Sequence, residues 1–315
     1  MKVTLGICLF LAVASSVFAG PRDVVYVTDT ETKDSNPAVA GDSRIDTFRQ
    51  KDELLKLYSR STAARILREK LTPVCGGMGF KMSSTTLKEY TNLCEGERFG
   101  DEPSIATCTG FLIGEDLLAT AGHCMTGPAT CASSAWVFDY RTDAIGSFKD
   151  PHVLATSVFY CKEIVKSVQP SAFSSEDWAV IRLDRKVTNR KPLPLRAAGK
   201  IEDDAKLSMI GYPVGLPLKI ATEAKVVGNS ADVYFNATLA SFGGNSGSPV
   251  INQKTGLVEG ILVRGERDFT RDEENDCLRV NVCEEQNCKG EGVTRIAPVN
   301  LLLWTLSWST PPISN

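Results

Sequence analysis

The fold is decided by the stretch Ser241-Phe242-Gly243-Gly244-Asn245-Ser246-Gly247-Ser248-Pro249-Val250. Its glycines allow the backbone around Ser246 to adopt positive φ and to come close to a bound substrate. The backbone N–H groups of Gly244 and Ser246 can then converge on one point and stabilise an oxyanion. The same residue types are also common in surface turns. The choice between a nucleophile loop and a turn therefore depends on the rest of the chain.

A base for Ser246 is the first thing to look for, because a serine hydroxyl is a weak nucleophile at neutral pH. Histidine is the usual base, and the chain holds two, His123 and His152, both before Ser246. His123 follows the apolar run 117–121, so the end of a strand would hold its imidazole in place. His152 stands next to a proline in a polar turn, and we assign it no catalytic role.

The group that orients the base is predicted to be Asp177, which opens the apolar run 178–183. A carboxylate in this position is expected to be partly buried, and a buried charge is costly unless it is paired or hydrogen-bonded. The imidazole N–H of His123 is the partner that we expect. Taken alone, Asp177 would be interpreted as a cap at the end of a strand.

The order His, Asp, Ser along the chain excludes other hydrolase classes. α/β-Hydrolases run Ser, Asp, His and subtilisin-like enzymes run Asp, His, Ser. The GxSxG motif also fails here, because position 248 is a serine. No HExxH motif of a zinc hydrolase is present. We therefore expect neither a metal nor a cofactor.

Three motifs, in this order, resemble those of the chymotrypsin-fold serine proteases, in particular the secreted bacterial trypsin-like and glutamyl-endopeptidase branch. They are Thr120-Ala121-Gly122-His123-Cys124, Asp177-Trp178-Ala179-Val180 and Gly243-Gly244-Asn245-Ser246-Gly247-Ser248-Pro249. The resemblance covers about residues 104–296. It implies an all-β fold of two six-stranded antiparallel barrels with the site between them.

The resemblance also implies an activity, which is that of a secreted serine endopeptidase acting on protein or peptide substrates. Ser246 would attack the scissile carbonyl, His123 would take and return the proton, and Asp177 would hold the histidine tautomer. The N–H groups of Gly244 and Ser246 would form the oxyanion hole. Two alternatives use the same residues: an inactive protease-like binding protein, and an esterase.

Short apolar runs separated by turn residues follow Pro73 and predict an all-β domain. The strands that we predict are 105–113, 117–120, 135–140, 153–159, 178–183, 207–211, 220–227, 233–237, 249–252 and 257–263. The proline-containing segment 187–200 is predicted to connect the two barrels. The charged, cysteine-rich segment 264–292 is predicted to be a loop held by a disulfide, and apolar residues after Pro298 predict a short C-terminal helix.

Three domains are predicted. Residues 1–19 have Lys2, an apolar run and small residues before Gly20, which is typical of a signal peptide and predicts a secreted or periplasmic protein. Residues 20–70 are predicted to be an N-terminal extension or a propeptide, with one or two helices at 50–70. Residues 71–315 are predicted to be the catalytic domain.

Nine cysteines remain after the predicted signal peptide, and in an exported protein they are expected to form disulfides. A hairpin would bring Cys108 next to Cys124, which would fix the loop that carries His123. The pairs Cys131–Cys161 and Cys75–Cys94 are also predicted. The odd cysteine is expected within the group Cys277, Cys283 and Cys288.

Substrate preference is less well defined by the sequence. Ala240, followed by Ser241, stands where trypsin-like enzymes carry an aspartate for basic side chains, which argues against a tryptic preference. Leu262 stands where glutamyl endopeptidases carry a histidine, so Arg264 is the candidate to bind an acidic side chain. The sequence leaves three alternatives for the preferred substrate side chain: acidic, small or apolar. Asn245 replaces the aspartate that binds the new N-terminus of activated trypsin-like zymogens.

The composition excludes two classes of partner. The net charge is −3 and the pI about 5.6, so the chain has neither the basic surface that nucleic acids need nor a polybasic membrane patch. No segment after the signal peptide approaches the roughly 20 apolar residues that span a bilayer. We expect a monomer without a membrane anchor.

Overall fold

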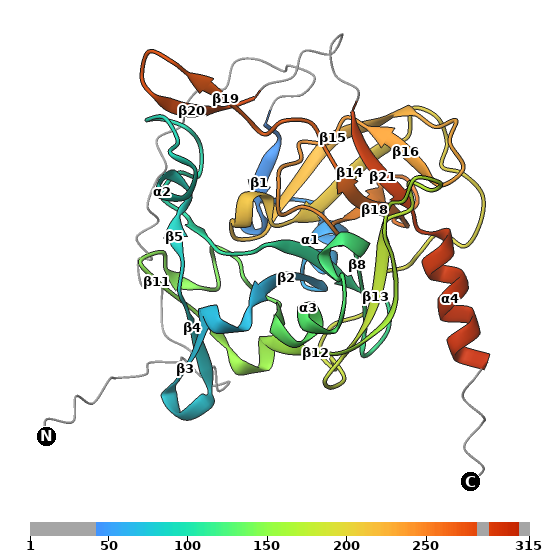
Figure 1. The fold of residues 1–315 in the computed structure, drawn as a ribbon, viewed down its shortest axis with the longest axis horizontal. Helices are drawn as coiled ribbons and strands as arrows, with labels where there is room; N and C mark the ends of the chain where they lie inside the picture. The colour runs from blue at the N-terminus through green and yellow to red at the C-terminus, as the bar shows by residue number, and fades with distance from the viewer. Residues whose placement is uncertain (1–41, 282–289, 309–315) are drawn as a thin grey trace, which may run out of the picture. The chain divides into compact units, whose positions relative to one another are not determined.

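The computed structural model describes residues 42–281 and 290–308. These residues belong to one compact unit, Val39–Asn315, and the predicted signal peptide lies outside them. Two antiparallel β-barrels make up most of this unit (Figure 1). None of the described helices is both long and apolar enough to span a membrane.

The first barrel is closed by six strands that each pair with antiparallel neighbours. Its interior is filled by fully buried side chains such as Trp136, Phe111 and Leu118. In order around the barrel, the strands are β12 (Val158–Val168), β13 (Trp178–Leu183), β8 (Leu117–Thr120), β7 (Cys108–Leu112), β2 (Thr62–Leu67) and β9 (Ser134–Val137).

The second barrel is also antiparallel and closes where β15 pairs with β16. In order, its strands are β15 (Lys219–Gly228), β14 (Lys206–Gly211), β17 (Pro249–Asn252), β18 (Val258–Arg264), β21 (Glu291–Arg295) and β16 (Tyr234–Ala237). A short strand, β1 (Arg44–Asp46), extends the edge of β15. The predicted fold of two six-stranded antiparallel barrels is therefore confirmed.

Smaller elements surround the barrels. The short strands are β3 (Leu71–Val74), β4 (Gly79–Met82), β5 (Thr85–Thr86), β6 (Pro103–Ser104), β10 (Gly146–Ser147), β11 (Asp150–Leu154), β19 (Phe269–Asp272) and β20 (Cys277–Val280). The α-helices are α1 (Glu53–Ser59), α2 (Leu87–Thr91), α3 (Pro128–Ser133) and α4 (Ala297–Trp308). Short 3₁₀ turns lie at Thr47–Arg49, Arg68–Lys70, Cys75–Gly77, Gly122–Cys124, Ala155–Ser157 and Pro213–Gly215.

The strand predictions need several corrections, and β19 and β20 lie within the segment 264–292 that was predicted to be a loop. The single strand predicted at 153–159 is in fact the end of β11 and the start of β12, separated by a 3₁₀ turn. Most of β12 was missed because its second half is rich in charged residues, which a barrel strand tolerates where one face meets water. Strand β21 was also missed, and its first residues lie in the segment predicted to be a loop.

The helices predicted across 50–70 are wrong beyond residue 59. Helix α1 is capped by Asp52, whose Oδ1 accepts hydrogen bonds from Leu54 N at 2.8 Å and Leu55 N at 3.3 Å. The chain then continues as β2, which pairs with β7 and β9. Strand pairing overrides a helical spacing of apolar residues here, because tertiary contacts outweigh intrinsic propensity. A domain boundary at residue 70, as predicted, would separate β1 and β2 from the barrel strands with which they pair.

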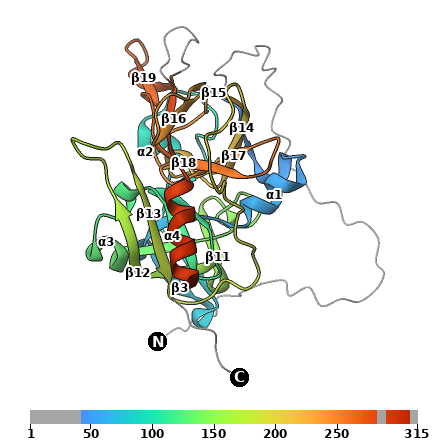
Figure 2. The ribbon, with the colours of Figure 1, turned by 90° about the vertical axis from the view of Figure 1, so that its right-hand side faces the viewer.

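The predicted C-terminal helix is present as α4, which runs along β13 of the first barrel (Figure 2). Val299 is fully buried, and Leu302 and Leu303 pack against the core of the barrel. Leu301 and Trp304 lie on its exposed side. This helix follows β21, so it connects the second barrel to the wall of the first.

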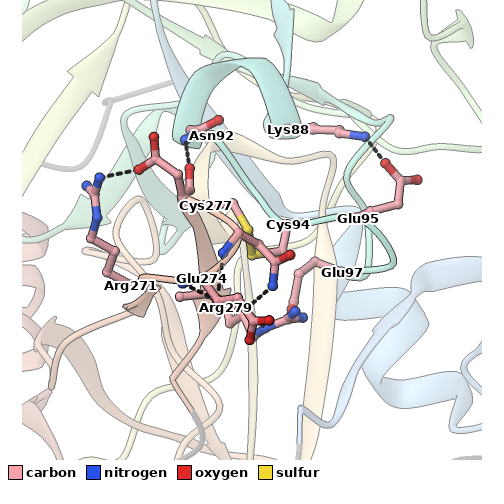
Figure 3. Close-up of a disulfide and its surroundings, with 12 residues drawn as sticks. Lys88, Asn92, Cys94, Glu95, Glu97, Arg271, Glu274, Cys277 and Arg279 are labelled. Atoms are coloured by element: carbon pink, nitrogen blue, oxygen red, sulfur yellow. Dashed lines mark hydrogen bonds and ion pairs between the residues drawn. A yellow bond between two sulfur atoms is a disulfide. The ribbon is translucent and has the colours of Figure 1, made fainter.

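Two of the three predicted disulfides are formed, Cys108–Cys124 and Cys131–Cys161. The third prediction is wrong, because Cys94 is bonded to Cys277 (Figure 3). This bond lies where β20 meets the segment after α2, and Cys94 N donates to the carbonyl of Leu278 at 2.9 Å. Cys75 is disulfide-bonded as well. Cys283 and Cys288 lie outside the described residues.

A buried charge cluster fastens the N-terminal strand β1 to the second barrel. Lys219, with a side chain only 1% exposed, contacts Asp46 at 2.5 Å and Glu102 at 2.7 Å. Such a cluster is stable only while its charges compensate one another. We therefore expect the loss of any one of these charged side chains to destabilise the attachment of β1.

Replacing Lys219 tests this cluster. Lys219→Met removes the cation that bonds both buried carboxylates, and we expect the free energy of unfolding in urea to fall by about 3–5 kcal/mol. The matched control is Lys186→Met, because Lys186 pairs with Glu115 at an exposed site, where both side chains are 69% exposed. This control should cost under about 1 kcal/mol. Equal losses in the two variants would contradict the assignment.

Candidate active site

His123 and Asp177 form a direct pair at the edge of the first barrel. The imidazole Nδ1 lies 2.7 Å from Asp177 Oδ2, and the backbone N–H of His123 donates to Oδ1 at 2.9 Å. Asp177 precedes β13 and its side chain is 4% exposed, whereas the side chain of His123 is 40% exposed. Both carboxylate oxygens therefore hold one histidine in place, and the Nε2 atom of that histidine is not bound by Asp177.

Ser246 lies where the nucleophile loop of the second barrel meets the first barrel. Its carbonyl accepts a hydrogen bond from Thr109 N of β7 at 2.8 Å. The same carbonyl lies 3.7 Å from the sulfur of Cys124, the residue next to His123. The Cys108–Cys124 disulfide thus fixes both the histidine segment and the surface on which the serine loop rests.

The Ser246 hydroxyl itself forms no hydrogen bond with a described residue, including His123. In structures without substrate, the hydrogen bond between nucleophile and base is often long and shortens only when substrate binds. The second histidine, His152, lies on β11, where its Nδ1 contacts the carbonyl of Asp150 at 2.7 Å. Of the two histidines, His123 is therefore the one whose segment contacts Ser246, through the neighbouring Cys124.

The backbone before Ser246 has the geometry of a donor site. Gly244 has φ +88°, and its carbonyl is turned away to accept from Thr109 Oγ1 at 3.0 Å. Within the described part of the chain, the N–H groups of Gly244 and Ser246 donate to no acceptor, whereas Asn245 N donates to Phe242 O at 3.0 Å. The two N–H groups predicted to form the oxyanion hole are thus available.

Asn245 is buried, with 1% exposure, and its Nδ2 has no hydrogen-bond partner in the described residues. Its Oδ1 accepts only a long hydrogen bond of 3.4 Å from Ser248 Oγ. A neutral amide cannot form the ion pair that a new N-terminal ammonium would need. The loop therefore takes this shape without a charge at position 245.

The predicted specificity residues differ in burial and in the groups that they contact. Leu262 is 2% exposed, belongs to the core of the second barrel, and bonds the loop through its backbone, since its carbonyl accepts from Gly247 N at 2.7 Å. Arg264 is exposed, with its guanidinium carbon 5.0 Å from the ring centroid of Tyr234. Ala240 is half-buried against the barrel core, and Ser241 is half-buried too.

Two acids near the nucleophile loop were not predicted from the sequence. Asp268 Oδ2 accepts a hydrogen bond from Gly243 N at 2.8 Å, and burial raises its pKa. Glu291, the first residue of β21, is 7% exposed and close enough to Ser241 for the serine hydroxyl to affect its pKa. One signal was available: like Asp177, Glu291 is a lone carboxylate that opens a strand.

The β19–β20 hairpin supports the loop from outside. The rings of Phe242 and Phe269 pack with their centroids 6.0 Å apart. Asp268 immediately precedes β19, and the Cys94–Cys277 disulfide fastens the hairpin at β20 (Figure 3). The covalent anchor of the hairpin therefore also holds the segment that bonds Gly243.

Cysteine, histidine and carboxylate atoms come within 4.8 Å of one another at two places among the described residues. These are Cys108, His123 and Cys124, and Cys94, Asp272 and Cys277. Each group contains both sulfurs of a disulfide, and a disulfide sulfur is not the thiolate that binds a metal. We assign no metal-binding role to either group.

Residues 108–261 match the family model of the trypsin-like peptidase domain. The matched segment contains His123, Asp177 and Ser246. No curated protein matches the chain.

Three solved structures illustrate what the chain is similar to. A Glu endopeptidase in complex with MPD has 16% identity and a TM-score of 0.49, covering 86% of this chain and 98% of that chain. Human heparin binding protein has 15% identity and a TM-score of 0.46, covering 67% and 90%. The VesB protease of Vibrio cholerae has 12% identity and a TM-score of 0.47, covering 79% and 64%.

Gly247 offers a test of how tightly the serine loop sits on the first barrel. It has φ +94°, and an added Cβ would lie 1.9 Å from the carbonyl oxygen of Thr109. Gly247→Ala should therefore destabilise the protein by more than about 4 kcal/mol. Gly199→Ala is the control, because Gly199 has φ +78° with no atom within 4 Å of an added Cβ. It should cost only about 1–2 kcal/mol, and similar urea midpoints for the two variants would contradict the predicted contact.

Proposed function

We propose that His123, Asp177 and Ser246 form the catalytic triad of this chain. The chain belongs to the trypsin-like peptidases and is thus a serine endopeptidase. The contact between His123 and Asp177 carries this proposal. Because Asp177 Oδ2 accepts from Nδ1, the ring is held in the tautomer whose Nε2 lone pair is free. Nε2 is the atom that can take the proton of the Ser246 hydroxyl.

The reaction follows from these positions. Ser246 Oγ attacks the carbonyl carbon of the scissile peptide bond while His123 takes its proton, and the carbonyl oxygen becomes an oxyanion between the N–H groups of Gly244 and Ser246. His123 then gives the proton to the leaving amine, and an acyl-enzyme on Ser246 remains. Water, activated by the same histidine, hydrolyses the ester. Loss of one oxyanion donor typically costs about 2.7–4 kcal/mol.

We further propose that the enzyme is exported and acts as a monomer. The disulfides of the described residues support export, because such bonds persist in oxidising compartments; they include Cys94–Cys277, Cys108–Cys124 and Cys131–Cys161. The predicted signal peptide at 1–19 agrees with this assignment. Its substrates are proteins or peptides, as expected of the family.

Covalent labelling tests the nucleophile. A fluorophosphonate probe should label the wild-type protein, and Ser246→Ala should abolish labelling because the attacking oxygen is removed. Ser248→Ala is the control, since Ser248 is two residues away on the same loop. Equal labelling of wild type and Ser246→Ala would contradict the mechanism. A protein that takes no probe and cleaves no peptide would be the inactive binding protein instead.

Replacing the orienting acid tests the histidine tautomer. In Asp177→Asn, an amide N–H can face Nδ1, which favours the tautomer with the proton on Nε2. We expect kcat to fall by about 10⁴ with little change in KM. Asp184→Asn is the control, because Asp184 also lies at an end of β13 but bonds Tyr160 N at an exposed site. If Asp177→Asn kept wild-type kcat, the carboxylate would have no catalytic role.

A further inference from the structure

Glu291 is placed by the register of three strands. On one side it lies opposite Ala237 of β16, and on the other its neighbour Gly292 lies opposite Arg264 of β18. Its side chain reaches over Gly265, where an added Cβ would lie only 2.0 Å from Oε2. The carboxylate therefore lies against the end of β18, the strand to which the nucleophile loop is bonded.

The nucleophile loop lies on the other side of this carboxylate. The hydroxyl of Ser241, five residues before Ser246, is close enough to lower the pKa of Glu291, and Asp268, which bonds Gly243 N, contributes a like charge nearby. Glu291 is thus enclosed between the loop that carries the nucleophile and the strand after Leu262.

The carboxylate lacks a counter-charge. Oε1 accepts from Glu266 N at 3.1 Å, but Oε2 is buried without a hydrogen-bond partner, and no described Lys or Arg pairs with Glu291. Arg264 extends over Tyr234 instead. Burial and the acids Asp268 and Glu266 raise the pKa of Glu291 to about 7. A buried carboxylate without a counter-charge is costly, and a cationic ligand would supply that charge.

We propose, on the basis of the function above, that Glu291 is the specificity-determining residue of this protease and that it binds a lysine or arginine side chain on the residue that donates the scissile carbonyl. A cationic group would bind Oε2 and replace the missing counter-charge. Because the side chains of Ala240 and Ser241 are small, they would not prevent the substrate cation from reaching the carboxylate.

This assignment revises two expectations from the sequence. The absence of an aspartate at position 240 argued against basic substrates, but a carboxylate from β21 supplies the charge. An acidic substrate side chain is disfavoured, because Glu291 and Asp268 would both repel it. Arg264, the candidate for binding an acid, lies exposed beside Tyr234.

The experiment compares matched peptide amides that carry Lys, Arg, Phe or Glu before the scissile bond. Wild type should cleave the Lys and Arg peptides with the highest kcat/KM. In Glu291→Gln, kcat/KM for Lys should fall at least about thirtyfold, the low end for truncating one partner of a buried charge pair, while kcat/KM for Phe stays within about threefold. Glu274→Gln, an exposed acid in the turn between β19 and β20, is the charge-matched control and should change neither value.

Two outcomes would overturn the assignment: a wild-type preference for Glu or Phe, or an unchanged Lys-to-Phe ratio in Glu291→Gln. Each would be seen with an enzyme that still labels with the fluorophosphonate probe. Failure of the proposed function itself would look different, because the wild type would then neither label nor cleave any of the four peptides.

A second measurement uses the wild type alone, in case Glu291→Gln does not fold. The Lys-to-Phe ratio of kcat/KM should fall as pH falls through about 7, because Glu291 becomes protonated in the free enzyme. Titration of the triad cancels in this ratio. The groups that face Glu291 are Ser241, Glu266 and Asp268. A ratio that is constant between pH 5.5 and 8.5 would contradict the role of Glu291.

Discussion

The pairing of His123 with the buried carboxylate of Asp177 is the interaction on which the site depends. Asp177 is 3% exposed, and its two carboxylate oxygens accept two N–H groups from one residue, at 2.7 and 2.9 Å. The disulfide at Cys124 then fixes the histidine segment against the carbonyl of Ser246. Thr109 of the first barrel also bonds the carbonyls of Ser246 and Gly244, so several polar contacts hold the two barrels together at the proposed site.

Two buried acids differ in a way that supports the separate roles we propose for them in catalysis and in recognition. Asp177 has its hydrogen-bond partners within the protein, so we assign it to orienting His123 and not to binding a ligand. Glu291 also opens a strand and is also buried, but Oε2 has no partner in the described chain. The first acid is satisfied by the fold, whereas we assign the second to the substrate.

Local patterns in the sequence predicted much of the fold and the three catalytic candidates. Strands such as 117–120 and 178–183 were bounded correctly because apolar runs there end at clear turn residues. The strand at 62–67 was not recognised, since its apolar residues also fit a helix and only pairing with β7 and β9 decides. Neither the Cys94–Cys277 bond nor the position of Glu291 next to Ser241 could be derived, because both join segments far apart in the chain and depend on strand register.

The central claim is that Ser246 becomes acylated during turnover. The most direct measurement uses an activated ester of an acylated lysine as the substrate. The reaction is stopped by lowering the pH, the protein is digested, and the acyl group is located by mass spectrometry. We expect a single added acyl group in the peptide that contains Ser246, and none in His123→Ala treated in the same way. An acyl group on another residue, or rapid turnover with no covalent intermediate in the wild type, would contradict it.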